Sequence, residues 1–145
     1  MDMRRAVLRE ARQWLDTPYR HQASRRAVGC DCLGLVRGVW RSLYGAEPEA
    51  LPPYTPDWAE ANGEETLLEA ARRWLIQTDD PQPGDVVVFR LKPGVPCKHI
   101  GILDRGGDTV IHAYWGRAVV ESWLHPFWSR RIAASFRFPQ REDLP

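Results

Sequence analysis

The sequence predicts one α+β domain in which N-terminal helices pack on a C-terminal antiparallel β-sheet. Two patterns support this class: apolar residues recur at helical spacing up to residue 75, and short β-rich runs separated by turn signals follow from residue 86. Helices that precede strands in this way are typical of α+β domains. The chain has 145 residues, 43% hydrophobic and 27% charged, which fits a single domain over residues 1–145.

Three segments of the first half carry an apolar stripe at helical spacing. The second is the best delimited, because it opens at Cys32 and has Gly45 as a stop signal. Between the second and third segments, four prolines make residues 47–57 an extended connector within the domain. We therefore expect helices over residues 7–15, 32–43 and 67–75.

The second half changes to runs that are rich in β-branched and aromatic residues. Turn signals at Pro93-Gly94, Gly106-Gly107 and Gly116 separate these runs at hairpin spacing. Hairpin connections predict an antiparallel sheet. The expected strands are residues 86–89, 99–103, 109–114, 118–122 and 132–138.

Charge and composition argue against several classes of partner. The chain has 20 basic and 19 acidic residues, a net charge of +1, so it lacks the basic surface expected for binding nucleic acid or anionic membranes. No window approaches the roughly 18 to 20 apolar residues that span a bilayer. The start resembles no secretory signal, and we expect a soluble protein made in the cytoplasm. Three cysteines, an odd number, favour a reduced site over a disulfide framework.

Cys32 opens the second predicted helix, and His99 and His112 lie on two consecutive predicted strands. A thiol at a helix N-terminus beside a histidine has a lowered pKa and unpaired backbone N–H groups near it, which suits a nucleophile at an oxyanion site. An odd-numbered turn would separate the two histidines, whereas an even-numbered turn places them directly across from each other on one face. His99 then acts as the base and His112 fixes its tautomer. The structural alternative is a buried cysteine with two packed histidines.

Four motifs in a fixed order carry a resemblance to a known family. They are Asp31-Cys32-Leu33-Gly34-Leu35-Val36, Pro83-Gly84-Asp85-Val86, His99-Ile100-Gly101-Ile102 and Ile111-His112-Ala113. Together they resemble the NlpC-type bacterial cell-wall cysteine peptidases over about residues 6–138. The resemblance implies a reduced papain-like fold and a cysteine endopeptidase without a cofactor. The implied substrate is a peptidoglycan stem peptide, cut between D-γ-glutamyl and a diamino acid.

The same resemblance implies roles for individual residues. It makes Cys32 the nucleophile, His99 the general base and His112 the polar orienting residue. Many relatives have serine where this chain has Leu33, so substrate contacts made there do not carry over. The candidates for substrate binding or oxyanion support are Tyr19, Asp31, Leu33 and Trp115. The basic pairs Arg25-Arg26 and Arg130-Arg131 either meet stem-peptide carboxylates or are solvated surface.

Residues 19–24 and 30–40 resemble a narrower branch, encoded with phage and gene-transfer-agent tails. This resemblance implies phage-like tail proteins as partners beside the stem peptide. It also implies a protein that is associated with a virion or tail and acts on the cell wall in the periplasm.

Three alternatives use the same residues differently. Cys30, Cys32, Cys97 and His99 could supply four zinc ligands to a structural site, although the one-residue spacing is tighter than usual. A catalytically silent tail module could bind the wall through the same groove. In the third alternative the protein is an enzyme that keeps the thiol chemistry but transfers the acyl group to an amine or a lipid.

Overall fold

The computed structural model describes residues 2–47 and 65–144. Within these ranges the chain forms three α-helices, eight strands and three single-turn 3-10 helices. The helices are α1 (Met3–Arg12), α2 (Cys32–Tyr44) and α4 (Thr66–Trp74), and the 3-10 helices are Arg105–Gly107, Ser129–Arg131 and Arg141–Asp143. The strands are β1 (Ser24–Arg25), β2 (Gly29–Cys30), β3 (Ile76–Gln77), β4 (Val86–Phe89), β5 (His99–Asp104), β6 (Thr109–Ala113), β7 (Val119–Trp123) and β8 (Ile132–Arg137).

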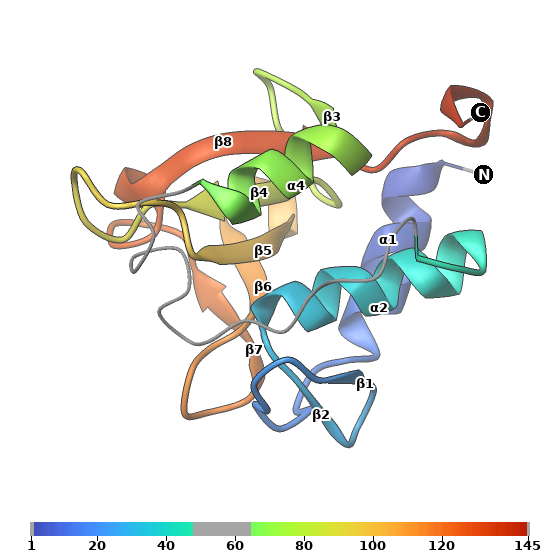
Figure 1. Cartoon of the computed structure of the whole chain (residues 1–145), viewed down its shortest axis with the longest axis horizontal. Coiled ribbons are helices and arrows are strands. Elements are labelled where there is room, and N and C mark those ends of the chain that lie inside the picture. Colours follow the sequence, from blue (N-terminus) through green and yellow to red (C-terminus); the bar gives the residue numbers. More distant parts are fainter. Residues whose placement is uncertain (1, 48–64, 145) are drawn as a thin grey trace.

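Six strands form one antiparallel sheet in the order β3-β8-β4-β5-β6-β7, and β1 pairs with β2 in a separate ribbon. The helix α1 packs against α2, and α2 packs against β5 (Figure 1). Helix α4 lies close to β3 and β8, and its buried residues join the same core as those of α1 and α2 (Figure 1). The predicted α+β class, with helices on an antiparallel sheet, is confirmed.

The first helix ends earlier than its apolar stripe predicts. It stops at Arg12, and Trp14 follows in a turn with only 3% of its surface exposed. The Trp14 ring packs on α2 at Gly38, where an added Cβ atom would lie 2.1 Å from the ring. Glycine at this position therefore lets the two segments approach closely. At the far end of α2, Gly45 has a φ of 94° and ends the helix as predicted.

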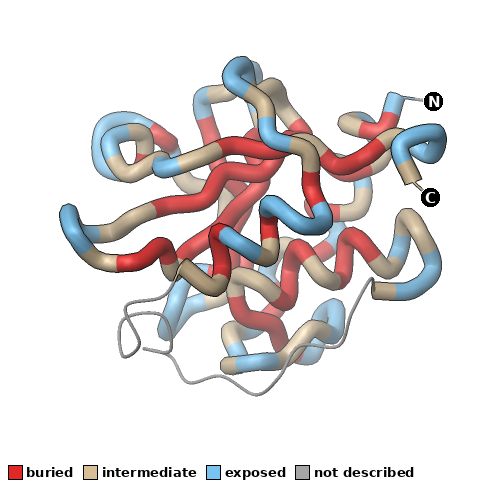
Figure 2. The backbone as a smooth tube through the Cα atoms, turned by 45° about the horizontal axis from the view of Figure 1, so that its top comes forward, coloured by how far each residue is buried: buried red, intermediate tan, exposed pale blue. Residues whose placement is uncertain are grey.

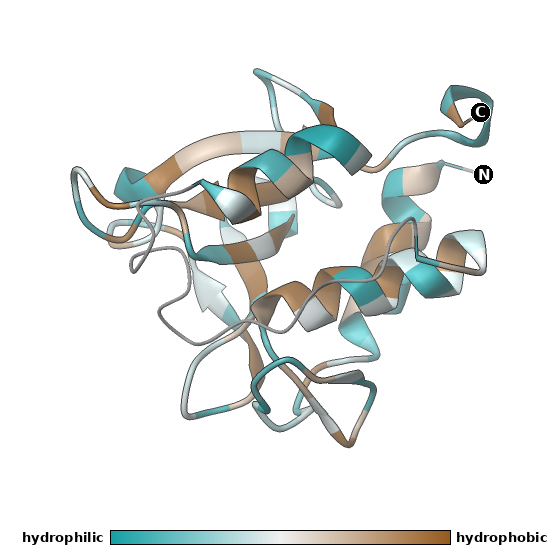
Figure 3. Cartoon of the chain, viewed as in Figure 1, coloured by the Kyte–Doolittle hydropathy of each residue, from teal (hydrophilic) through white to brown (hydrophobic). Residues whose placement is uncertain are grey.

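The central strands are buried on both faces of the sheet. Val86 and Val88 of β4 join a core with the helices, whereas Val87 and Phe89 join a smaller cluster with Trp128 on the opposite face. Figure 2 shows buried backbone along the central strands and the inner sides of the helices. Hydrophobic residues follow the same segments in Figure 3. This double burial explains why β4 is a continuous apolar run rather than an alternating one.

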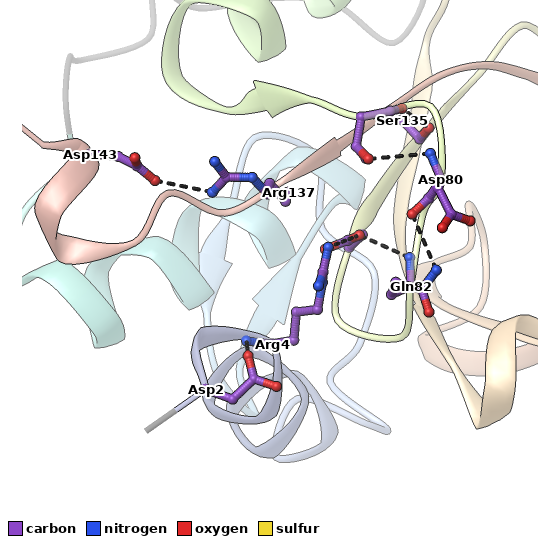
Figure 4. Close-up of polar contacts among 9 residues, drawn as sticks. Asp2, Arg4, Asp80, Gln82, Ser135, Arg137 and Asp143 are labelled. Atoms are coloured by element: carbon purple, nitrogen blue, oxygen red, sulfur yellow. Dashed lines mark hydrogen bonds and ion pairs between the residues drawn. The ribbon is translucent and has the colours of Figure 1, made fainter.

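An ion pair joins α1 to the turn before β4. The fully buried Asp85 carboxylate accepts hydrogen bonds from Arg4 Nε at 2.9 Å and from the Gln82 N–H at 2.9 Å. Figure 4 shows Arg4 extending from α1 toward the turn that carries Gln82. Gly84 has a φ of 95°, and a Cβ atom there would lie 2.6 Å from the Arg4 carbonyl oxygen. The Pro83-Gly84-Asp85 motif therefore has a role in the fold.

Three short strands have no signal in the sequence. β1, β2 and β3 have two residues each, which is too short for an alternating pattern, so the predicted loop before Cys32 contains the β1–β2 ribbon. The predicted connector over residues 47–57 lies, apart from Glu47, outside the described residues. Among the helices that the structure describes, none is long and apolar enough to cross a membrane.

Candidate active site

Cys32 is the first residue of α2, and Asp31 caps the helix. One Asp31 carboxylate oxygen accepts a hydrogen bond from the Gly34 N–H at 2.7 Å, and the other accepts from the Gln22 N–H at 2.8 Å. A Cβ atom at Gly34 would lie 1.9 Å from the Ala23 carbonyl oxygen, so the helix and the preceding loop are in close contact. These contacts fix the thiol at the helix N-terminus, as predicted.

The two histidines lie on the same face of neighbouring strands but are not directly opposite. Asp104 pairs with Thr109 at the end of the β5–β6 hairpin, and this register puts His112 across from Gly101. The predicted direct pairing of His99 with His112 is therefore wrong. His112 lies opposite a residue two positions after His99, so the two histidines are diagonal neighbours. A Cβ atom at Gly101 would lie 3.1 Å from the His112 Cβ. The bare glycine leaves room for His112 to contact His99.

A third side chain continues the histidine pair. His112 Nδ1 lies 2.7 Å from His99 Nε2, and His112 Nε2 lies 2.8 Å from Ser122 Oγ. For His99 to accept a proton at Nδ1, its Nε2 must be protonated and donate to His112 Nδ1. His112 is then protonated at Nε2 and donates to Ser122. The Ser122 hydroxyl can accept this hydrogen bond, so the chain of contacts is compatible with the tautomers that leave His99 Nδ1 able to accept a proton.

Aromatic rings enclose the histidine pair. Trp128 stacks on His99 with ring centroids 5.1 Å apart and meets His112 edge-on at 4.9 Å. The Phe89 ring lies 5.7 Å from that of His99. Burial lowers the pKa of His99 to about 3, with a contribution from His112, and lowers the pKa of His112 to about 4. Both imidazoles are therefore neutral near pH 7.

Burial also determines the state of the thiol. It raises the pKa of Cys32 to about 12, and the Asp31 carboxylate adds to the rise. Backbone N–H groups of Ile100, Leu33 and Cys32 itself lower the pKa, but by less than burial raises it. The expected lowering of the thiol pKa at a helix N-terminus is thus outweighed by desolvation. Near pH 7 the site therefore holds a neutral thiol and neutral imidazoles.

Cys32 and His99 line one cleft with a volume of about 530 Å³. Cys32 Sγ lies 3.9 Å from the Lys98 carbonyl oxygen, which places the sulfur at the start of β5 beside His99. Burial raises the pKa of the Tyr19 hydroxyl, and Cys32 adds to the rise. Trp115 is 71% exposed. The described lining consists of Tyr19, Cys32, Leu91, Lys98, His99, Ala113 and Trp115.

The four predicted support residues fall into two groups. Tyr19 and Trp115 line the cleft, whereas Asp31 and Leu33 are not among its described lining residues. Asp31 is 2% exposed; one of its oxygens caps α2 at Gly34, and the other accepts from the Gln22 N–H of the preceding loop. Leu33 lines an apolar groove between α2 and α4, together with Leu67 and other residues. The structure therefore gives Asp31 a positioning role and turns the Leu33 side chain toward packing.

The four proposed zinc ligands do not form a metal site. Cys30 and Cys97 are free and fully buried, and the Cys97 N–H donates to a Glu65 carboxylate oxygen at 2.6 Å. In the part of the chain that the structure describes, no three His, Cys, Asp or Glu side chains are arranged to hold a metal ion. The structure does not support the zinc-binding alternative through Cys30, Cys32, Cys97 and His99.

Two residues of the site have little signal in the sequence. Ser122 ends a predicted strand. In the structure it lies on β7, two residues from Val120, which pairs with His112. The polar side chain of Ser122 was the available clue in the sequence. Trp128 lies between strands, in a connection without periodicity, so only its residue type distinguished it. Both residues come into contact with the histidines only through the folded arrangement.

Comparisons with known proteins agree on one family. The model of the NlpC/P60 family matches residues 16–137. The chain is 30% identical over 115 residues to a protein of Escherichia coli (strain K12) described as "Probable endopeptidase NlpC". This match covers 79% of the chain and 64% of that relative, so the chain spans somewhat less than two thirds of its length.

Solved structures show the same fold at lower identity. The NlpC/P60 domain of the peptidoglycan hydrolase SagA superposes with a TM-score of 0.62 at 23% identity, covering 93% of this chain and 98% of that one. An NlpC/P60 family protein from Bacillus cereus ATCC 10987 gives 0.63 at 18% identity, covering 93% of this chain and 40% of that one. Together with the family model, these likenesses confirm the resemblance at the family level. The chain belongs to the NlpC/P60 family.

Proposed function

We propose that this protein is a cysteine peptidase that hydrolyses amide bonds in the stem peptides of peptidoglycan. The observation that carries the proposal is one cleft that holds the Cys32 thiol at a helix N-terminus and His99 at the end of the chain of hydrogen bonds through His112 to Ser122. A nucleophile, its base and an oriented supporting group are the parts that acyl transfer through a thiol requires.

The neutral resting state determines the order of the steps. As the Cys32 sulfur attacks the amide carbonyl, the thiol proton passes to His99 Nδ1, and the carbonyl oxygen becomes an oxyanion near the helix N-terminus. The imidazolium that forms is stabilised by its hydrogen bond to His112. It then protonates the leaving amine, and the acyl group stays on sulfur as a thioester. Water, deprotonated by His99, releases the acid and restores the thiol.

The bond between D-γ-glutamyl and a diamino acid is the specific target that we propose. It is supported by the motif resemblance and by similarity to a relative described as a probable endopeptidase. We further propose that the protein is delivered with a phage-like or gene-transfer-agent tail and acts in the periplasm. The support for this delivery is the resemblance of residues 19–24 and 30–40 to that branch. Co-purification with tail particles tests it, and absence from such particles would contradict it.

Mass spectrometry of muropeptides tests activity and bond choice together. Purified peptidoglycan incubated with the protein should release fragments with new termini at the D-γ-glutamyl bond. The Cys32→Ala variant should release none while keeping the wild-type circular dichroism. Cys97→Ala is the matched control, because this thiol is buried outside the cleft, and it should keep activity. Lysis by the Cys32→Ala variant would end the proposal, and binding without product release would favour a silent wall-binding module.

A further inference from the structure

A second pocket adjoins the cleft that holds Cys32. It has a volume of about 370 Å³ and lies where β4 ends and β8 begins, with Leu91, Arg131 and Ile132 in its lining. Leu91 lines both spaces, so they are neighbours across one side chain. A peptide that extends along the cleft past Leu91 therefore meets this pocket.

The two linings carry charge of one sign only. Arg90, Arg130 and Arg131 line the pocket and Lys98 lines the cleft, whereas no Asp or Glu is among the described residues of either lining. The whole chain is nearly balanced, with 20 basic and 19 acidic residues. Basic side chains are therefore more concentrated at this surface than in the chain as a whole. Such a concave surface attracts and concentrates anions.

Two of the three arginines have no carboxylate partner among the described residues. Arg90 is paired, because it donates to a Glu65 carboxylate oxygen at 2.7 Å. Arg131 donates from Nη1 to the Phe127 carbonyl oxygen at 2.7 Å and from Nε to the Leu91 carbonyl oxygen at 3.4 Å. Its guanidinium carbon lies 3.7 Å from the centre of the Phe127 ring. These contacts orient Arg131 without neutralising it. Arg130 is exposed, and within the described residues no carboxylate forms an ion pair with Arg130 or Arg131.

We propose that this arginine pocket, formed by Arg90, Arg130 and Arg131, is a substrate subsite that binds a free carboxylate of the peptide being cleaved. The proposal rests on the proposed function, because its ligand is the peptide that reaches Cys32. The oriented Arg131 keeps Nη2 to donate to a carboxylate, and the planar guanidinium of the exposed Arg130 matches its two oxygens. A carboxamide at the same position carries no charge and turns an N–H group toward the guanidinium. The pocket therefore selects peptides whose acid group is not amidated.

Matched peptides test the subsite. Each test uses two stem peptides that differ at one position, where one carries a free carboxylate and the other a carboxamide. Their kcat/KM values are compared, and each acid group of the peptide is tested in turn. For one position, the wild-type protein should prefer the carboxylate by about tenfold, the range of a charge-assisted hydrogen bond. Arg130→Gln should lower this preference about threefold and Arg130→Glu further. Arg5→Gln, at an exposed arginine on α1 that lines neither space, should keep the wild-type preference.

A binding measurement separates failure of the subsite from failure of the proposed function. Calorimetry with the Cys32→Ala variant should show tighter binding of the carboxylate peptide, and Arg130→Gln added to that variant should weaken the preference. Equal cleavage and equal binding of both peptides at every position would overturn the subsite and leave the peptidase intact. Cleavage of neither peptide by the wild-type protein would overturn the peptidase, while calorimetry still decides the subsite. Thermal unfolding confirms that each variant is folded.

Discussion

Replacing Asp31 with Asn separates a positioning role from a substrate-binding role. The two carboxylate oxygens accept hydrogen bonds from Gly34 and Gln22, at 2.7 and 2.8 Å, and the side chain is only 2% exposed. Asparagine has nearly the same shape but only one oxygen. The Asp31→Asn variant therefore keeps one of these bonds and turns its NH2 group toward the other backbone N–H.

The structure predicts two effects of opposite direction. A buried N–H left without an acceptor costs about 1–3 kcal/mol, so the unfolding temperature should fall by roughly 3–10 °C in a chain of this size. The Asp31 carboxylate contributes to the raised pKa of the Cys32 thiol, second to burial. Removing that charge lowers the thiol pKa, and alkylation of Cys32 should become faster at any pH below it.

Thermal unfolding by circular dichroism and the rate of iodoacetamide alkylation measure the two effects. Asp2→Asn is the matched control, because Asp2 caps α1 at an exposed position and should change both quantities little. Unchanged stability of Asp31→Asn together with slower alkylation would refute the reasoning. A higher KM with normal stability and normal alkylation would instead identify Asp31 as a substrate contact.

Three further variants test the relay, the helix packing and the acid limb of stability. Ser122→Ala should lower kcat about fivefold with KM unchanged, because the buried His112 Nε2 loses its hydrogen-bond partner, and Ser122→Thr should restore it; a changed KM alone would contradict the relay. Gly38→Ala brings a Cβ atom to 2.1 Å from Trp14 and should destabilise the fold by about 1–3 kcal/mol, so an unchanged unfolding temperature would contradict the packing. Burial alone would raise the pKa of Glu121, but hydrogen bonds from arginine and threonine neighbours hold it at about 2. Because this folded pKa is depressed, its stabilisation is present above about pH 4.5 and is lost as pH falls toward 2; Glu121→Gln should therefore flatten the acid limb of a stability–pH curve, and an unchanged limb would contradict this.

The helices and main strands were predictable because their burial is periodic along the chain. The stripe from Cys32 to Leu43 marks the face of α2 that enters the core, and Gly45 ends the helix with a φ that other residues rarely adopt. The continuous run Val86–Phe89 follows from burial on both faces of the sheet. Strands of two residues, such as β1 and β2, have no period and were missed.

The candidate site was predictable only in part. The sequence by itself determined the chemical types: a thiol at a helix start, two histidines on consecutive strands, and an order of motifs typical of one family. Only the tertiary structure decided that His112 lies opposite Gly101 and therefore diagonal to His99, and that Ser122 contacts His112. It also decided that burial keeps the Cys32 thiol neutral. Register, desolvation and contacts between distant segments depend on how strands and helices come together, and no local pattern of residues encodes them.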